Sequence, residues 1–273
     1  MPRPSFWPPS ARHRALIRFS LLAGIAAAAY LIKGLTGFGP AIVFISLGSL
    51  VMDPARVVAV SPLLDIAAGG ILIWKDKSIA SFRYWSTLTL PLIAGVVAGA
   101  WGFRSLSGAL YGRILGLTIV GLGLWFVLRK IPGSLITANT TGPGQPAQDP
   151  PGTPPLRPEP GAMIAAGVSG ITGGLFGISG PPLIWYFGSR YPRRMFRRII
   201  VPLFLVEAAV RTCVYAALGV LHREEWGIAL GLLPAMLIGL MIGNHWFNVI
   251  PQHRFERVIG GVLILSGIKL FLG

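Results

Sequence analysis

The chain has 273 residues, of which 53% are apolar and only 12% charged, whereas about a quarter of the residues of a soluble domain are charged. The net charge of +15 lies mostly between the apolar runs, as in membrane-protein loops, and no basic patch is interleaved with aromatic residues as in a nucleic-acid-binding domain. Composition therefore argues against nucleic acid as a partner and predicts an all-α polytopic protein of the lipid bilayer.

Eight apolar segments follow one another along the chain, and each is predicted to be helical. They cover residues 17–51, 57–74, 84–103, 109–128, 161–189, 199–221, 226–250 and 256–272. The basic N-terminus before the first segment resembles a signal peptide, but no cleavage site follows, so we expect an uncleaved first span. The first and fifth segments are longer than the roughly 20 residues that one crossing needs.

These two long segments each contain a glycine-rich motif that ends in proline. The motifs read Gly34-Leu35-Thr36-Gly37-Phe38-Gly39-Pro40 and Gly173-Gly174-Leu175-Phe176-Gly177-Ile178-Ser179-Gly180-Pro181-Pro182. Glycine and proline interrupt helices, and bare backbone inside a bilayer is tolerated only in protein or beside a cavity. Paired interruptions in matching halves point to a transporter binding site. The alternative is that the glycines let helices cross closely.

The two halves of the chain repeat one another. An offset of 144 residues pairs Gly95 with Gly239 and Gly99 with Gly243, and an offset of 140 pairs Gly34 with Gly174. The proline-rich stretch 131–160 reads as an extended linker. We therefore expect a first membrane repeat at residues 1–130, a linker at 131–160 and a second membrane repeat at 161–273, each repeat with four segments and opening with a glycine-broken helix.

The distribution of basic residues leaves the topology open. With a cytoplasmic N-terminus and eight simple crossings, Lys75 and Arg129 lie inside, in agreement with the positive-inside rule. The cluster that contains Arg190 and Arg198 then lies outside, against the rule. If a glycine-broken segment is re-entrant or crosses twice, the halves are inverted relative to each other, as in many secondary transporters.

The interrupted backbone is the leading candidate for an anion site. Free N–H groups and the N-terminal dipole of a half-helix bind an anion without a charged side chain, and hydroxyl groups add donors. The predicted substrate-binding residues are Gly34, Thr36, Gly37, Phe38, Gly39, Gly174, Gly177, Ser179, Gly180 and Arg211. Arg211 is included as a direct ligand because its planar guanidinium group suits the oxygens of sulfite or a carboxylate.

Asp65 and Glu207 are the acids that fall deep inside predicted spans. An intramembrane carboxylate is a functional candidate, and one or both of these acids are predicted to couple anion movement to protons. Glu207 and Arg211 are four residues apart on one helical face, so a structural ion pair is the alternative. Lys33, directly before the first motif, either attracts the anion or snorkels beside the helix break.

At the two motifs the chain resembles the sulfite exporter TauE/SafE family, over about residues 20–128 and 161–272. The resemblance implies a secondary transporter of small anions, namely sulfite, sulfonates or related organosulfur and carboxylate compounds. Transport would proceed by alternating access between the two repeats. A multi-pass protein of the bacterial inner membrane is the expected setting.

The sequence lacks the common motifs of metalloenzymes, phosphate-binding proteins and serine hydrolases. The sequence has no His-Glu-x-x-His, no phosphate-binding loop and no Gly-x-Ser-x-Gly, so we expect no catalytic residue, no metal and no cofactor. An anion channel is the first alternative and an intramembrane enzyme a weaker one. The oligomeric state stays open.

Overall fold

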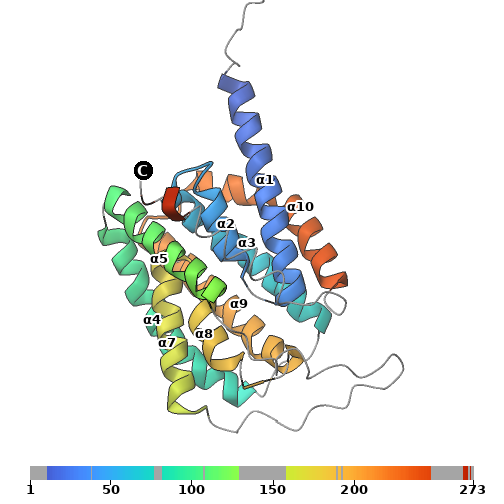
Figure 1. Cartoon of the computed structure of the whole chain (residues 1–273), viewed down its shortest axis with the longest axis vertical. Helices are drawn as coiled ribbons and strands as arrows, with labels where there is room; N and C mark the ends of the chain where they lie inside the picture. The colour runs from blue at the N-terminus through green and yellow to red at the C-terminus, as the bar shows by residue number, and fades with distance from the viewer. Residues whose placement is uncertain are drawn as a thin grey trace, which may run out of the picture.

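The computed structural model describes residues 11–37, 39–76, 82–106, 108–128, 158–188, 190–191, 193–246, 267–269 and 271 (Figure 1). The regular elements in these ranges are all helices, as composition predicts. They are α1 (Ala11–Thr36), α2 (Pro40–Gly48), α3 (Pro54–Asp76), α4 (Phe82–Ser105), α5 (Gly108–Leu128), α7 (Pro160–Phe176), α8 (Gly180–Phe187), α9 (Arg193–Ala217) and α10 (Arg223–His245). Nearly all of the predicted linker and most of the eighth apolar segment lie outside the described residues.

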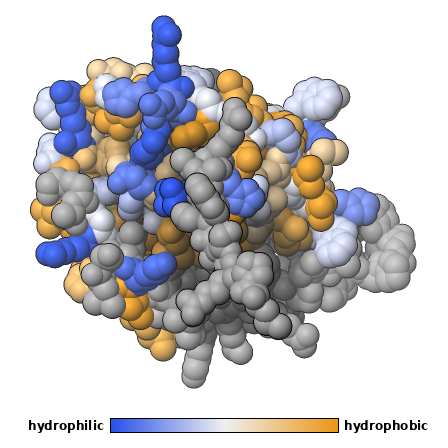
Figure 2. Space-filling model, turned by 90° about the horizontal axis from the view of Figure 1, so that it is seen from above, coloured by the Kyte–Doolittle hydropathy of each residue, from blue (hydrophilic) through white to orange (hydrophobic). Residues whose placement is uncertain are grey.

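Five of the described helices are long and apolar enough to cross a membrane. They are Leu16–Thr36, Pro54–Lys75, Tyr84–Ser105, Met195–Ala217 and Arg223–His245. Large apolar side chains such as Leu90, Trp101 and Leu230 are exposed on their outer faces, as lipid contact requires. Seen along its long axis, the molecule presents hydrophilic side chains at its end, among apolar ones (Figure 2). The protein is a multi-pass membrane protein, as predicted.

Helices α1 and α2 form a hairpin. Between them Gly37 and Gly39 have φ angles of 85° and 83°, in the left-handed region that favours glycine, and Pro40 starts α2, where its fixed φ suits a first helical turn. A β-carbon placed on Gly39 would lie 3.9 Å from Ile32, and one on Gly48 would lie 3.5 Å from Leu22. Helix α2 therefore runs back along α1.

Helices α7 and α8 form a second hairpin. Gly177 ends α7 with φ 75°, and its N–H donates to the carbonyl oxygen of Gly173 at 2.8 Å. Helix α8 begins at Gly180, directly before two prolines. Near its other end the hydroxyl of Tyr186 donates to a carboxylate oxygen of Glu159, just before α7, at 2.6 Å. Helix α8 therefore returns to the level at which α7 starts.

The centre of the molecule is an antiparallel pair, α3 and α9. In the most apolar stretch of each helix, 67% of α3 and 61% of α9 is buried, against 33–39% of the same stretch in the other three candidate spans. Ser61 accepts a hydrogen bond from Arg211 at 3.1 Å. Two turns further along α3, a β-carbon on Gly69 would lie 3.3 Å from Leu205, which precedes Arg211 in α9. The two helices therefore run in opposite directions.

The outer helices pack as two parallel pairs, α1 with α10 and α4 with α7 (Figure 1). A β-carbon on Gly239 or Gly243 of α10 would collide with backbone oxygens of α1, at Ala27 and Leu31. A β-carbon on Gly95 or Gly99 of α4 would likewise collide with backbone oxygens of α7, at Gly167 and Ile171. Because only glycine leaves room at these crossings, the helix backbones touch directly.

Candidate functional site

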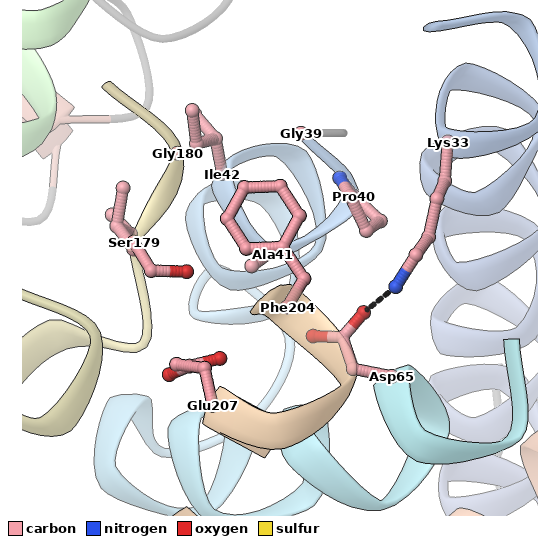
Figure 3. A pocket seen from close by; sticks show the side chains of 11 residues that line it. Lys33, Gly39, Pro40, Ala41, Ile42, Asp65, Ser179, Gly180, Phe204 and Glu207 are labelled. Carbon is pink, nitrogen blue, oxygen red and sulfur yellow. Dashed lines mark hydrogen bonds and ion pairs between the residues drawn. The ribbon is translucent and has the colours of Figure 1, made fainter. Parts of the chain in front are cut away.

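The two hairpin ends meet at the middle of the α3–α9 pair. Between them lies a cavity of about 20 Å³ (Figure 3), which is room for about one water molecule. It is lined by Lys33, Gly39, Pro40, Ala41, Ile42, Asp65, Ile178, Ser179, Gly180, Phe204 and Glu207. The N-termini of α2 and α8 both open onto it, so their positive dipole ends converge there.

One side of the cavity is a buried ion pair between α1 and α3. The ammonium group of Lys33 lies 2.6 Å from Asp65 Oδ1 (Figure 3), and the hydroxyl of Tyr30 donates to the same oxygen at 3.1 Å. Lys33 is 2% exposed and Asp65 6%. A buried charge is costly unless it is paired and hydrogen-bonded, so each of these residues requires the other.

Arg211 is fully buried beside the cavity and ties α9 to α3 and α7. Its Nη1 donates to the carbonyl oxygen of Gly173 at 3.0 Å, and its Nη2 donates to Ser61 at 3.1 Å. The Gly173 carbonyl belongs to the last turn of α7, where a cation is stabilised by the negative end of the helix dipole. Nη2 lies 3.7 Å from Asp65 Oδ2, and Nη1 lies 3.4 Å from Glu207 Oε1.

Glu207 lines the opposite side of the cavity from Lys33 and Asp65, next to Ser179 (Figure 3). It is 3% exposed, and its Oε1 accepts no hydrogen bond from the described residues beyond the ion pair with Arg211. A β-carbon on Gly173 would lie 2.6 Å from this oxygen. The glycine at that position of α7 therefore leaves the space that the carboxylate occupies.

The structure brings five of the twelve predicted residues together at the cavity. Gly39, Ser179 and Gly180 line it, with both predicted acids, Asp65 and Glu207. The hydroxyl of Ser169 donates to the backbone oxygen of Ser179. Arg211 stands behind this wall, where it makes both the predicted ion pair with Glu207 and bonds to Ser61 and Gly173.

Among the described residues, the other predicted glycines and Thr36 do not line the cavity. Gly34 and Gly174 sit at the crossings with α10 and α4, where a β-carbon would meet backbone atoms. Gly37 packs against the stem of Arg197, and Gly177 against Ile45 and Arg211. The Thr36 hydroxyl donates to the Ile32 carbonyl at 2.8 Å, within its own helix. Phe38 lies outside the described residues.

Sequence reasoning missed two features of the site. It considered Lys33 and Asp65 separately, because nothing in a single sequence links residues 32 positions apart on different helices. It also missed the apolar wall, formed by Ile42, Ile178 and Phe204, since these residues resemble any other core side chains. Asn244 of α10 accepts a hydrogen bond from Arg197 of α9 at 2.5 Å.

Comparison with known proteins assigns a family to this arrangement. The family described as sulfite exporter TauE/SafE matches residues 21–270. A protein of Cupriavidus necator named probable sulfite/organosulfonate exporter TauE is 27% identical over 252 residues, which is 87% of each chain. No solved structure matches.

Proposed function

Because the chain belongs to the TauE/SafE sulfite exporter family, we propose that it is a secondary transporter that carries sulfite, organosulfonates or related carboxylate anions. The observation that carries this proposal is the convergence of two helix N-termini and Lys33 on one small buried cavity. Helix N-termini bind anions through free N–H groups. Because this attraction comes from partial charges, the anion is held and still released.

We propose further that the two halves are inverted repeats. The contact of α1 with α10 has a counterpart in the contact of α7 with α4, at positions 140 and 144 residues apart. The matched contacts are Ala27 with Gly239, Gly167 with Gly95, Leu31 with Gly243, and Ile171 with Gly99. The equivalent central helices, α3 and α9, run antiparallel. Inverted repeats of this kind recur in secondary transporters, with the site at their interface.

Inverted halves with re-entrant hairpins also account for the positions of the basic residues near the loops after α3 and α8. Each hairpin then enters and leaves at one face, and the loops after α3, α5 and α8 share a single face. Lys75 lies at the end of α3, Arg83 lies in the first turn of α4, and Arg190 follows α8. The positive-inside rule makes that face cytoplasmic, which removes the conflict at Arg190, while Arg14 and Arg18 at the start of α1 then lie toward the outer face. The α1–α2 hairpin then opens toward the outer face.

The small size of the cavity supports alternating access. About 20 Å³ admits one water molecule but not a four-atom sulfur oxyanion with its contacts. Loading therefore requires one hairpin end to move away from the other. The α7–α8 end is held by Arg211 and by Tyr215, whose hydroxyl donates to the Gly174 carbonyl at 2.6 Å. Asp65 or Glu207 carries any proton that accompanies the anion.

Anion flux in proteoliposomes tests this proposal. The panel contains sulfite, sulfoacetate, taurine, thiosulfate, acetate and chloride, each with and without a pH gradient. Saturable flux of a sulfur anion is the expected result. Flux that does not saturate and ignores the gradient would indicate a channel, and no flux of any member would contradict the proposal.

A further inference from the structure

The charges around the cavity cancel. Lys33 and Arg211 supply two positive charges, Asp65 and Glu207 supply two negative ones, and all four side chains are at most 6% exposed. An anion that enters this cavity without a counter-charge leaves a net negative charge in a buried, low-dielectric site. Such an uncompensated charge is strongly destabilising. One proton per monovalent anion restores neutrality.

The two acids differ in how firmly they are held as carboxylates. Asp65 accepts hydrogen bonds from Lys33 and Tyr30, at 2.6 and 3.1 Å, and lies 3.7 Å from Arg211. Glu207 has the ion pair with Arg211 at 3.4 Å, and its Oε1 accepts no hydrogen bond from the described residues. Protonation of Asp65 would break a buried network, whereas protonation of Glu207 weakens one longer contact.

The surroundings of Glu207 also favour protonation of Glu207 over protonation of Asp65. The charged groups that act on it are Arg211 of its own helix, Asp65 of α3 and Lys33 of α1. The elements α7 and α8 place Gly173 and Ser179 beside it, and neither carries a charge. The carboxyl group also lines the cavity, so a proton on it can be donated to an oxygen of the bound anion.

We propose that the cavity takes up one monovalent sulfur oxyanion together with one proton, which Glu207 carries, so that the loaded carrier is electrically neutral. This inference rests on the proposed transport function and narrows its substrates to monoanions. A dianion would need a second proton, on Asp65, at the expense of its bonds to Lys33 and Tyr30. Monosulfonates are therefore preferred over disulfonates.

Two sulfonates that remain fully ionised across the working pH range test the proposal in proteoliposomes of the full chain. Methanesulfonate should accumulate about tenfold for each pH unit of an inward proton gradient. It should not respond to a potassium diffusion potential, whereas an uncompensated charge would shift accumulation about fiftyfold per 100 mV. Ethane-1,2-disulfonate should not be taken up.

The variant Glu207→Gln separates the roles of the two acids. A neutral glutamine makes the empty cluster positive, so methanesulfonate should enter without a proton and accumulate with the potential instead of the pH gradient. The matched control is Glu224→Gln. Glu224 is an exposed acid at the start of α10 that pairs with Arg56 of α3, and this variant should behave like the wild type. Glu207→Gln that still follows the pH gradient would overturn the assignment.

A binding measurement decides the question if Glu207→Gln does not transport. Methanesulfonate binding to the purified wild type should take up about one proton, measured from the buffer dependence of the binding heat. Glu224→Gln, which keeps all four charges of the cluster, should take up the same amount, whereas Glu207→Gln, whose empty cluster already carries the extra positive charge, should take up none. Wild-type transport driven by the potential, or binding without proton uptake, contradicts this inference alone. Absence of all anion flux contradicts the proposed function instead.

Discussion

The ammonium group of Lys33 and the carboxylate of Asp65 lie 2.6 Å apart inside the molecule and join the end of α1 to the middle of α3. Lys33 belongs to the last turn before the first glycine motif. The ion pair therefore fixes the position of the α1–α2 hairpin end relative to the central helices. Movement of that hairpin has to break the pair or carry both helices along.

Removal of Lys33 should show how much this ion pair contributes to the stability of the folded protein. Lys33→Met leaves the Asp65 carboxylate buried without its main partner, and we expect the free energy of unfolding to fall by about 3–5 kcal/mol. The loss should shrink in Lys33→Met/Asp65→Asn, where neither charge is left alone. Unfolding in detergent measures both. Lys75→Met, at an exposed end of α3, is the control, and a loss equal to that of Lys33→Met would contradict the account.

Gly177→Ala should abolish transport. The residue has a φ angle of 75°, and a β-carbon there would lie 2.5 Å from Ile45 and 3.1 Å from Arg211. The added methyl group would displace the α7–α8 hairpin end from the cavity. Gly219→Ala introduces similar strain at a φ angle of 68°, with nothing within 4 Å, and should keep flux near the wild-type rate. Equal flux in both variants would show that the hairpin end does not shape the site.

Gly95→Ala and Gly239→Ala should destabilise the protein by similar amounts, because each glycine meets the backbone of the partner helix in a matched crossing. Overpacking of this kind costs about 1–3 kcal/mol. Gly121→Ala in α5 has open space around it and should be neutral or gain up to about 1 kcal/mol from helix propensity. Thermal unfolding measures the three variants, and tolerance of one crossing variant but not the other would argue against equivalent halves.

Single cysteines at Lys75 and Arg190 should react with a membrane-impermeant thiol reagent from the same side. The re-entrant arrangement places both loops on one face, whereas eight simple crossings place them on opposite faces. Cys213 is exposed and is replaced by serine in this background. A cysteine at Glu224, at the start of α10, serves as the reference for the other face. Labelling of Lys75→Cys and Arg190→Cys from opposite sides would rule out the inverted arrangement.

The sequence predicted the general class of the molecule because hydropathy over 20-residue windows is a local signal. The long helices and the membrane setting were correctly predicted on that basis, and the family was correctly predicted from the two glycine-rich motifs. The two-repeat organisation stays a prediction, supported by the matched contacts at Gly95 and Gly239. Residue-level roles were harder to predict, because a glycine with a left-handed φ, such as Gly177, looks the same in sequence as one at a helix crossing, such as Gly174.

The acids Asp65 and Glu207 were identified because a carboxylate inside an apolar run is rare. Their partners depend on which helices meet, and only the i, i+4 pair of Glu207 and Arg211 is visible along one helix. The bond from Lys33 to Asp65 requires the fold of the first hairpin. The same limitation explains why Phe204 and Ile178, which form the apolar wall, were not predicted.

Accessibility of Ser179→Cys, in the Cys213→Ser background, tests the central claim most directly. Ser179 lines the cavity between the hairpin ends and is 7% exposed. The account predicts that an impermeant thiol reagent reaches this cysteine from either side of the membrane in separate experiments, and that a transported sulfonate slows the reaction from both. Reaction from one side alone, with no protection by any transported anion, would contradict a shared site with alternating access.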